Sequence, residues 1–233
     1  TAIVDHPALD AVRKGVEDEL KAQGWQAGKN LKYQYQSAQG NAATAGQIVR
    51  KFIGDKADAI VAIATPSAQA AAAATSSVPI VFSAVTDPVA AKLVKDLKAP
   101  GGNVTGVSDR LPLAPQVDLM LKVVPTAKRV GIVYSPGEIN STILIKELKA
   151  VLAQRGMTLV SAAAPRTVDV QAATKSLVGK VDLIYSSTDN NVVSAYETMV
   201  RVATDAKLPM IAADTSSIKR GAVAALGMNY YDM

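Results

Sequence analysis

The sequence contains no cysteine and only one histidine among its 233 residues. The absence of cysteine excludes disulfides, thiolate nucleophiles and cysteine-ligated zinc. It does not decide the compartment, because a reducing cytosol and an exported protein without disulfides are both compatible with it. A single imidazole leaves little for nucleophilic catalysis, and no residues have the spacing of metal ligands. We therefore expect a protein that is not an enzyme and that needs neither a metal nor a cofactor.

Aromatic residues and clustered charges are also scarce. Phe, Trp and Tyr together make up 4% of the chain, and its net charge of +5 is spread over short basic groups. A nucleic-acid-binding protein would normally show a basic stripe or a set of stacking aromatic residues. We therefore expect no nucleic-acid partner. Hydrophobic residues make up 49% of the sequence, which indicates a globular chain that can bury a substantial core.

One long stretch, Ala59 to Thr86, has no charged residue. Its length alone would suggest a membrane span. However, Pro66, Pro79 and polar residues divide it into three pieces. The pattern predicts a buried strand, an alanine-rich helix and a second buried strand of a parallel sheet.

The sequence also repeats its own layout over most of its length. "TAIVDHPALDAVRKGVEDELKAQGW" corresponds to "VGIVYSPGEINSTILIKELKAVLAQRGM". Each reads as a strand, a polar loop with a proline, and a helix that ends near Gly24 or Gly156, as at a helix C-cap. The strands "LKYQYQS" and "TLVSAAA" follow, then a helix and strand in each half. Finally, "VPIVFSAVTDP" corresponds to "LPMIAADTSS".

Each half therefore reads βαβαβαβ, with helices as crossovers between parallel strands. We predict an α/β protein of two Rossmann-like lobes with parallel sheets and a ligand cleft between them. The expected N-terminal lobe spans residues 1–107, rejoined by 228–233, and the C-terminal lobe spans 108–227. The stretch "PGGNVTGVSDRLPLAP" is rich in Gly and Pro and is expected to connect the lobes.

Polar clusters follow the predicted strands, where ligands of open parallel sheets collect. The candidate ligand-binding residues of the first lobe are His6, Thr65, Ser67, Ser83, Thr86 and Asp87. Hydroxyls and free N–H groups at a helix N-terminus favour an anion. Helix capping is the alternative for Thr65 and Asp87, and His6 could be only a polar loop residue.

The candidate residues of the second lobe are Tyr134, Asn140, Ser141, Thr188, Asp189, Asn190 and Asp214. Asn140 or Ser141 could instead start the following helix. The carboxylates of this lobe can accept hydrogen bonds from an ammonium group, whereas the first lobe offers neutral donors. The complement of the two sets is a small zwitterion, which indicates an amino acid. A sugar would more often meet stacked aromatic rings, and Trp25 lies in a helix-end loop away from the expected cleft.

The motifs "HPALDAVRKG", "IATPSAQAA", "VFSAVTDPV", "PGGNVTGVSD", "YSPGEINS" and "STDNNVVSA" resemble the substrate-binding proteins of ABC transporters, in the branch associated with tryptophan and other aromatic amino acids. The resemblance implies the type I periplasmic-binding-protein fold, an amino-acid ligand and a permease partner in the membrane. It also implies a bacterial protein that is periplasmic or lipid-anchored outside the cytoplasm; we expect a monomer. In related binders, hydroxyls at the positions of Thr65, Ser67, Ser83 and Thr86 bind the carboxylate. Asp189 or Asp214 would bind the ammonium.

Chains of this family normally continue past the "YYD" motif, so we expect a leader and further C-terminal elements beyond this sequence. Two other functions fit the same fold. One is the effector-binding domain of a transcriptional regulator, which would carry a helix-turn-helix ahead of the first strand. The other is a binding protein for a different small solute, such as a sugar or a nucleoside.

Overall fold

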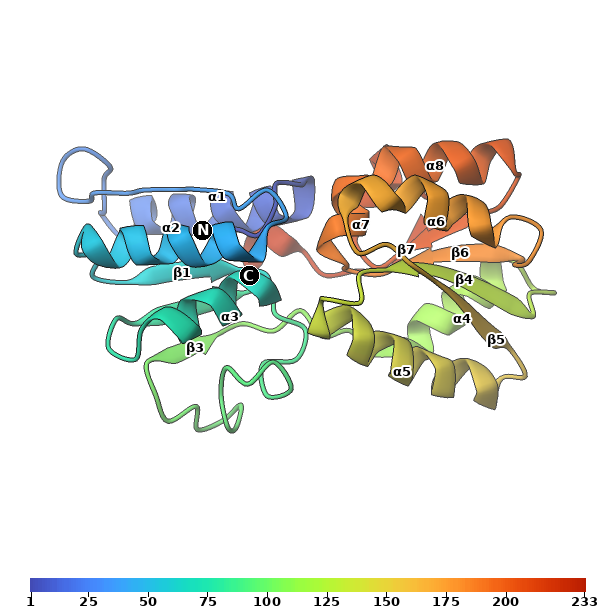
Figure 1. Cartoon of the computed structure of the whole chain (residues 1–233), viewed down its shortest axis with the longest axis horizontal. Coiled ribbons are helices and arrows are strands. Elements are labelled where there is room, and N and C mark those ends of the chain that lie inside the picture. Colours follow the sequence, from blue (N-terminus) through green and yellow to red (C-terminus); the bar gives the residue numbers. More distant parts are fainter. The chain divides into compact units, whose positions relative to one another are not determined.

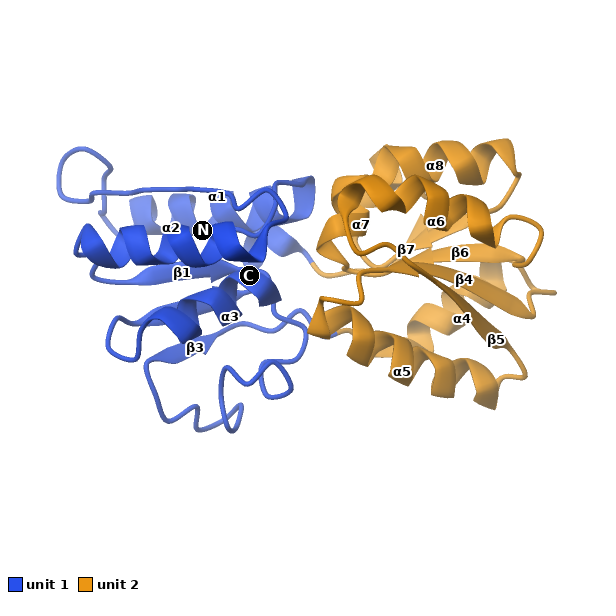
Figure 2. Cartoon of the chain, viewed as in Figure 1, with its two compact units in different colours: residues 1–110, 229–233 blue, residues 111–228 orange.

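The computed structural model describes residues 1–233, which form two compact units (Figure 2). Unit 1 comprises Thr1–Arg110 and Asn229–Met233, and unit 2 comprises Leu111–Met228. The chain thus leaves unit 1 after Arg110 and returns at Asn229. The sequence-based expectation placed these crossings after residues 107 and 227.

Unit 1 has a three-stranded parallel sheet in the order β1-β2-β3 (Figure 1). Helices α2 and α3 lie side by side, while α1 packs against the short 3₁₀ helix η3 near the end of the chain. The elements of this unit are α1 (Pro7–Ala22), α2 (Ala42–Gly54), β1 (Ile60–Ile63), α3 (Thr65–Ala74), β2 (Ile80–Ser83), β3 (Val104–Gly106) and η3 (Tyr230–Asp232).

Two strands predicted for the first half are wrong as strands. Residues 1–4 and 31–37 make only isolated parallel bridges, in which Ala2 pairs with Ser37 and with Ile63. The chain bends at residues 3–4, immediately after this pairing, so the ladder does not extend. A second correction concerns "PGGNVTGVSDRLPLAP", which is not only a connection, because it contains β3 and the first residues of helix α4.

Unit 2 has a five-stranded parallel sheet in the order β5-β4-β6-β7-β8. Its elements are α4 (Leu113–Val123), β4 (Arg129–Tyr134), α5 (Ile139–Gln154), β5 (Thr158–Ala163), η1 (Thr167–Asp169), α6 (Val170–Leu177), β6 (Leu183–Ser186), α7 (Asn190–Ser194), α8 (Tyr196–Asp205), β7 (Met210–Ala212), η2 (Thr215–Arg220) and β8 (Ala224–Ala225).

Both faces of this sheet are buried, as strand β6 shows. Leu183 and Tyr185 belong to one hydrophobic cluster, which also contains Leu148 of α5, whereas Ile184 belongs to another, which contains Met199 of α8. Successive side chains of a strand point to opposite faces, so a sheet covered by helices on both sides needs an uninterrupted apolar strand. The prediction of two α/β lobes with parallel sheets, of the type I periplasmic-binding-protein kind, is confirmed.

The uncharged stretch Ala59–Thr86 forms β1, α3 and β2, as predicted. Both strands pair in parallel, with Ile60 opposite Ile80 and Ile63 opposite Ser83. None of the helices combines the length and the apolar character that crossing a membrane would require.

Helix α1 packs closely against the end of the chain at Gly15. A methyl group on Gly15 would lie 2.0 Å from the carbonyl oxygen of Tyr231. Alanine normally stabilises a helix interior by about 1 kcal/mol relative to glycine. Here the clash reverses the sign, and we expect Gly15→Ala to lower the free energy of unfolding by roughly 1–3 kcal/mol in urea denaturation.

Gly46, inside α2, provides the matched control. A methyl group there would first meet the flexible guanidinium of Arg50, at 3.4 Å. Gly46→Ala should therefore raise stability by roughly 0.5–1 kcal/mol. If both variants were equally stabilised, the packing of η3 on α1 would be refuted.

Candidate functional site

The backbone is strained where two strands of unit 1 end. Ala64 follows β1 with φ 75° and ψ 156°, and Ala84 follows β2 with φ 55°. An alanine in such regions costs about 1–3 kcal/mol and persists only when its surroundings enforce it. The two turns are joined, because the Ala64 N–H donates to the carbonyl oxygen of Ser83 at 2.9 Å. The carboxyl edge of this sheet therefore has a fixed and costly geometry, as functional sites often do.

Hydroxyl groups without protein partners lie at this edge. The Oγ atoms of Ser67, in the first turn of α3, and of Ser83, the last residue of β2, are buried and have no hydrogen-bond partner in the protein. Buried polar atoms are usually paired, so each such exception needs an explanation. Thr65 is buried beside them but is the first helical residue, so the interpretation of Thr65 as N-cap is wrong; Ala64 is the N-cap.

Thr86 belongs to a different arrangement, built around Asp109. The buried Asp109 carboxylate accepts hydrogen bonds from the Thr86 hydroxyl at 2.9 Å and from the Tyr230 hydroxyl at 2.8 Å. Burial raises the pKa of Asp109. Asp109 and Tyr230 flank the two points at which the chain crosses between units. This carboxylate thus ties a strand-end loop to both crossing segments.

The two remaining candidates of unit 1 are Asp87 and His6. Asp87 accepts a hydrogen bond from the Ala90 N–H at 2.9 Å and forms an ion pair with Arg110 at 2.6 Å. No helix follows it, so the interpretation of Asp87 and Pro88 as a helix start is wrong; the capping contact closes a turn instead. His6 is buried and is the N-cap residue of α1.

In unit 2, Asp189 is fully buried after the end of β6. Its Oδ1 accepts hydrogen bonds from the Ser135 hydroxyl at 2.9 Å and the Val192 N–H at 3.1 Å. Its Oδ2 accepts from the Ser135 N–H and the Ser141 hydroxyl, both at 2.6 Å. Four donors fill the acceptor capacity of a carboxylate. Asp189 therefore joins the loop after β4, the start of α5 and the start of α7.

A second carboxylate, Glu138, is buried close to Asp189. Its Oε2 accepts hydrogen bonds from the side-chain amides of Asn140 at 3.0 Å and Asn190 at 2.6 Å, and its Oε1 accepts only from the Asn191 N–H at 3.3 Å. Burial and the negative charge of Asp189 raise the pKa of Glu138 to about 7. No Lys or Arg forms an ion pair with either of these two buried acids.

The other candidates around this acidic pair are drawn into the same network. Helix α5 begins at Ile139, so the interpretation of Asn140 or Ser141 as its starting residue is wrong; both lie within its first turn. The Asn140 amide also donates to the carbonyl oxygen of Thr188 at 3.4 Å. Tyr134 is the last residue of β4.

Asp214 lies at the end of the neighbouring strand, β7, and caps η2. Its Oδ1 accepts from Ser216 and from the Ser217 N–H, but its Oδ2 accepts only from the Ser217 hydroxyl. The hydroxyls of Ser186, the last residue of β6, and of Ser187, which follows it, are buried without a protein partner. Ser186 is paired with Ala212, so these groups and Asp214 follow adjacent strands.

Sequence reasoning noted the carboxylate of Glu138 without selecting it as a ligand-binding residue, and it left out Ser187 and Asp109. Glu138 stands in the recognised motif "YSPGEINS", and its position after a strand was the available signal. Ser187 stands in the polar cluster after β6. For Asp109 no local signal existed, because Tyr230, one of its two donors, is distant in sequence.

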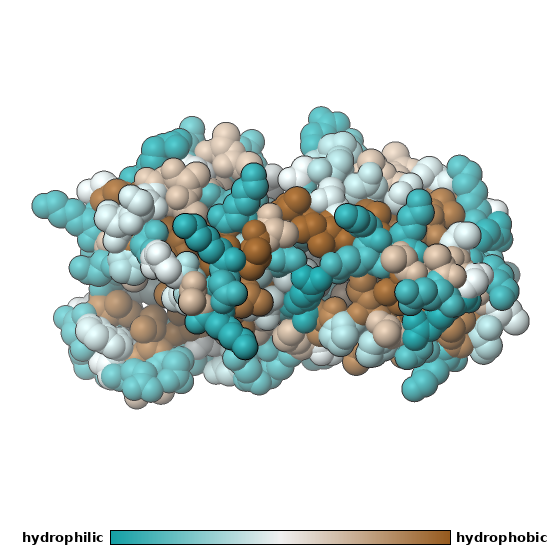
Figure 3. All heavy atoms as spheres, turned by 90° about the horizontal axis from the view of Figure 1, so that it is seen from below, coloured by the Kyte–Doolittle hydropathy of each residue, from teal (hydrophilic) through white to brown (hydrophobic).

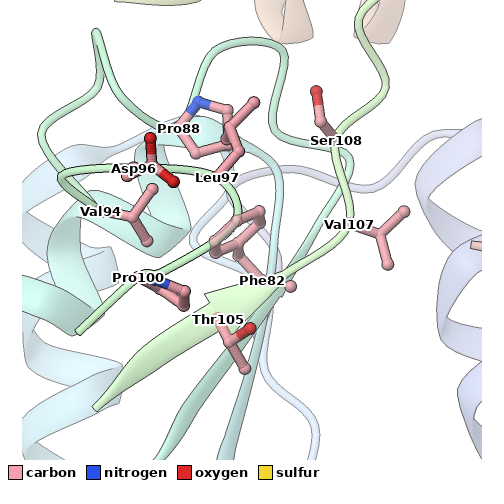
Figure 4. A pocket seen from close by; sticks show the side chains of 10 residues that line it. Phe82, Pro88, Val94, Asp96, Leu97, Pro100, Thr105, Val107 and Ser108 are labelled. Atoms are coloured by element: carbon pink, nitrogen blue, oxygen red, sulfur yellow. The ribbon is translucent and has the colours of Figure 1, made fainter. Parts of the chain in front are cut away.

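A cavity of about 290 Å³ in unit 1 has neither Ser67 nor Ser83 among its lining residues (Figure 4). It lies between β3 and the irregular segment after β2, and its walls are mostly apolar, with Phe82, Val94 and Leu97 among them. Hydrophobic residues are visible on both units in Figure 3, with one group at the lower left, on unit 1. No group of three or more His, Asp or Glu side chains is placed to hold a metal ion.

Comparison with known proteins agrees with this geometry. The family described as ABC transporter substrate binding protein matches residues 1–233. The chain belongs to the family of ABC transporter substrate-binding proteins. The resemblance predicted from the sequence motifs is therefore confirmed. This is a family of binding proteins.

Three relatives of this substrate-binding protein are informative. A tyrosine-binding protein of Clostridioides difficile is 41% identical over 98% of this chain, which spans 66% of that protein's length. A Streptococcus pneumoniae domain crystallised with L-Trp is 35% identical, with a TM-score of 0.95, covering 99% of this chain and 78% of its own. A conserved domain protein of Vibrio cholerae is 51% identical, with a TM-score of 0.97 and the same coverage.

The Asp189 network predicts a structural effect of mutation. Asp189→Ala leaves four buried donors without their acceptor, so we expect a loss of about 3–5 kcal/mol in unfolding free energy. Urea denaturation of the substrate-binding protein measures it. Asp182→Ala is the control, because Asp182 is a partly exposed carboxylate that also accepts backbone hydrogen bonds, and it should cost less. Equal losses of unfolding free energy in the two variants would show that burial of the Asp189 network does not contribute to stability.

Proposed function

We propose that this protein is the extracytoplasmic solute-binding component of an ABC importer and that its ligand is an aromatic amino acid, tyrosine or tryptophan. The observation that carries the proposal is the complementary chemistry of the two strand-end sites. Unit 1 offers unpaired buried hydroxyls, and unit 2 offers buried carboxylates without a basic side chain. The relatives named for tyrosine and crystallised with L-Trp support the aromatic class.

The ligand carboxylate is assigned to unit 1. Ser67 and Ser83 supply hydroxyl donors, and the first turn of α3 supplies backbone N–H groups that have no partner within the helix. The positive end of the helix dipole favours an anion at the same point. The strained turn at Ala64 holds these donors in place.

The ligand ammonium is assigned to unit 2, at Glu138 and Asp214. Each has one oxygen that accepts a single hydrogen bond from the protein, Oε1 of Glu138 and Oδ2 of Asp214. Asp189 has no such free position, so we assign it the role of holding Glu138 and the surrounding loops. An ammonium here would also neutralise a buried negative charge, which otherwise has no cationic partner.

The protein is further proposed to deliver its ligand, as a monomer, to a permease in the membrane. It would be either free in the periplasm or anchored by lipid. The first test is a thermal-shift comparison of tyrosine, tryptophan and phenylalanine with glucose, a nucleoside and phosphate. A ligand at 100 times its Kd adds about 2.7 kcal/mol of stability. A shift only with a sugar or a nucleoside would contradict the proposal.

Removing the unpaired hydroxyls separates binding from folding. Ser67→Ala and Ser83→Ala should each weaken tyrosine binding by about tenfold, the value of one hydrogen bond to a charged group. Neither should lower stability, because each removes a buried polar atom that has no partner in the protein. Calorimetric titration and thermal melts check the two effects. Thr44→Ala, which alters a partly exposed residue of α2, is the control. Unchanged affinity in both serine variants would refute the carboxylate site.

Glu138 gives the proposal a pH signature. With a pKa of about 7, Glu138 is neutral below pH 7 and ionised above it, while the ligand stays zwitterionic. Tyrosine affinity should therefore rise with pH from 6 to 8, by at most about tenfold per unit. Glu138→Gln should weaken binding at pH 8 by about ten- to hundredfold and make it independent of pH.

The stability of the ligand-free protein should change in the opposite direction. The folded pKa of Glu138 lies above its ordinary value of 4.5, so the folded protein holds this proton more tightly than the unfolded chain. The contribution of Glu138 to the stability of the folded protein is complete below about pH 4.5 and is lost as pH rises through about 7. Glu138→Gln should flatten this part of the profile. A variant that kept both pH dependences would show that another group titrates.

A further inference from the structure

The single tryptophan of the chain is exposed on the surface of unit 1. Trp25 is 49% exposed, and every residue from Lys21 to Asn30 is exposed with it. These residues form the loop that projects beyond the end of α1, drawn in blue at the upper left of Figure 1. One exposed aromatic side chain is common in proteins and means little alone. The folded loop that presents Trp25 and the lysines in and beside it make this tryptophan unusual.

The loop has a defined backbone. Gly24 and Gly28 have φ values of 90° and 80°, which glycine adopts without strain. Asn30 clamps the loop, because its side chain accepts from the Gln26 N–H at 2.7 Å and donates to the Gly24 carbonyl oxygen at 3.1 Å. The backbone N–H of Trp25 donates a hydrogen bond to the carbonyl oxygen of Leu20 at 2.9 Å. The indole is thus presented from a folded loop, so a partner would not have to order it.

The loop that carries Trp25 contains lysines but no acidic residue. From Leu20 to Gly54 the sequence contains no aspartate or glutamate. Lys21, Lys29 and Lys32 are exposed in or beside the loop, and none forms an ion pair with a carboxylate. Three lysines around a half-exposed indole therefore form a basic patch, which we call the Trp25 patch.

The Trp25 patch lies away from the strand-end hydroxyls of unit 1. Helix α1 begins beside the carboxyl edge of the sheet, at His6, and its 16 residues span roughly 24 Å before the loop starts. The patch therefore lies towards the opposite edge of the unit, and the amino-acid site does not account for it.

We propose that the Trp25 patch binds the anionic surface of a lipid membrane. Indole rings favour the membrane–water interface, where the ring is desolvated and its N–H stays hydrated. Lysines near an anionic surface add attraction that weakens with salt. An importer subunit works beside a membrane, so such a contact would keep the protein close to its permease. The inference does not depend on the identity of the ligand.

Trp25 reports on this contact directly, because it is the only tryptophan. The full chain, free of added amino acid, is titrated with vesicles of phosphatidylcholine containing one third phosphatidylglycerol, and then with pure phosphatidylcholine. With anionic vesicles we expect tryptophan emission to shift to shorter wavelength and the protein to co-sediment. We expect both effects to weaken in high salt and to be much smaller with neutral vesicles.

Two sets of variants test the residues. Lys29→Gln with Lys32→Gln should weaken partitioning onto anionic vesicles about fivefold for each lysine removed. Trp25→Ser, followed by sedimentation, should weaken it as well. The control removes the same charge from unit 2 through Lys146→Gln with Lys149→Gln, on the exposed side of α5. All these positions are exposed, so thermal melts should stay unchanged.

The outcomes separate cleanly. No emission shift with anionic vesicles overturns the proposal, and so does an equal shift with neutral vesicles. Equal losses in the patch and control variants would show that only net charge matters, which also overturns it. Loss confined to the Trp25 patch supports it, whether or not any amino acid binds.

Discussion

The structure of unit 2 depends on two buried carboxylates that no basic side chain neutralises. Glu138 and Asp189 are satisfied by hydroxyls, amides and backbone N–H groups, all of them neutral. These bonds come from the loop after β4, from α5 and from α7, so the two acids hold the strand-end loops in one arrangement. Burial, and after it the negative charge of Asp189, raise the pKa of Glu138, so ionising both acids together is costly. A ligand ammonium is the simplest group that would relieve this cost.

The strand ends of unit 1 carry hydroxyl groups where those of unit 2 carry carboxylates. Parallel strands bring their carboxyl ends to one edge, and there Ala64 and Ala84 adopt backbone conformations that alanine rarely occupies. Beside these turns, the buried hydroxyls of Ser67 and Ser83 have no partner in the protein. A duplicated βαβ layout can thus carry opposite polarities in its two copies. That is the arrangement a zwitterion requires.

Much of the fold, and part of the candidate site, could be predicted from the sequence. The uncharged stretch predicted β1, α3 and β2 because apolar runs and prolines act locally, and the duplication predicted two parallel α/β lobes. The strand at residues 31–37 failed because its pairing depends on how far the chain stays beside Ala2, which no local pattern encodes. The hydrogen bonding of Asp189 could not be predicted for a similar reason. Whether a strand-end aspartate is free or saturated depends on Ser135 and Ser141, which only the folded chain brings to it.

The most direct test of the account compares L-tyrosine with its analogue that lacks the amino group, by calorimetric titration on the unmodified protein at pH 8. The analogue keeps the phenol ring and the carboxylate but offers no ammonium to Glu138 and Asp214. We expect tyrosine to bind and the analogue to bind at least about a hundredfold more weakly. Without the ammonium group, the buried carboxylates have no cation beside them. Equal affinity for the two compounds would contradict the central claim that buried acids of unit 2 select the ligand.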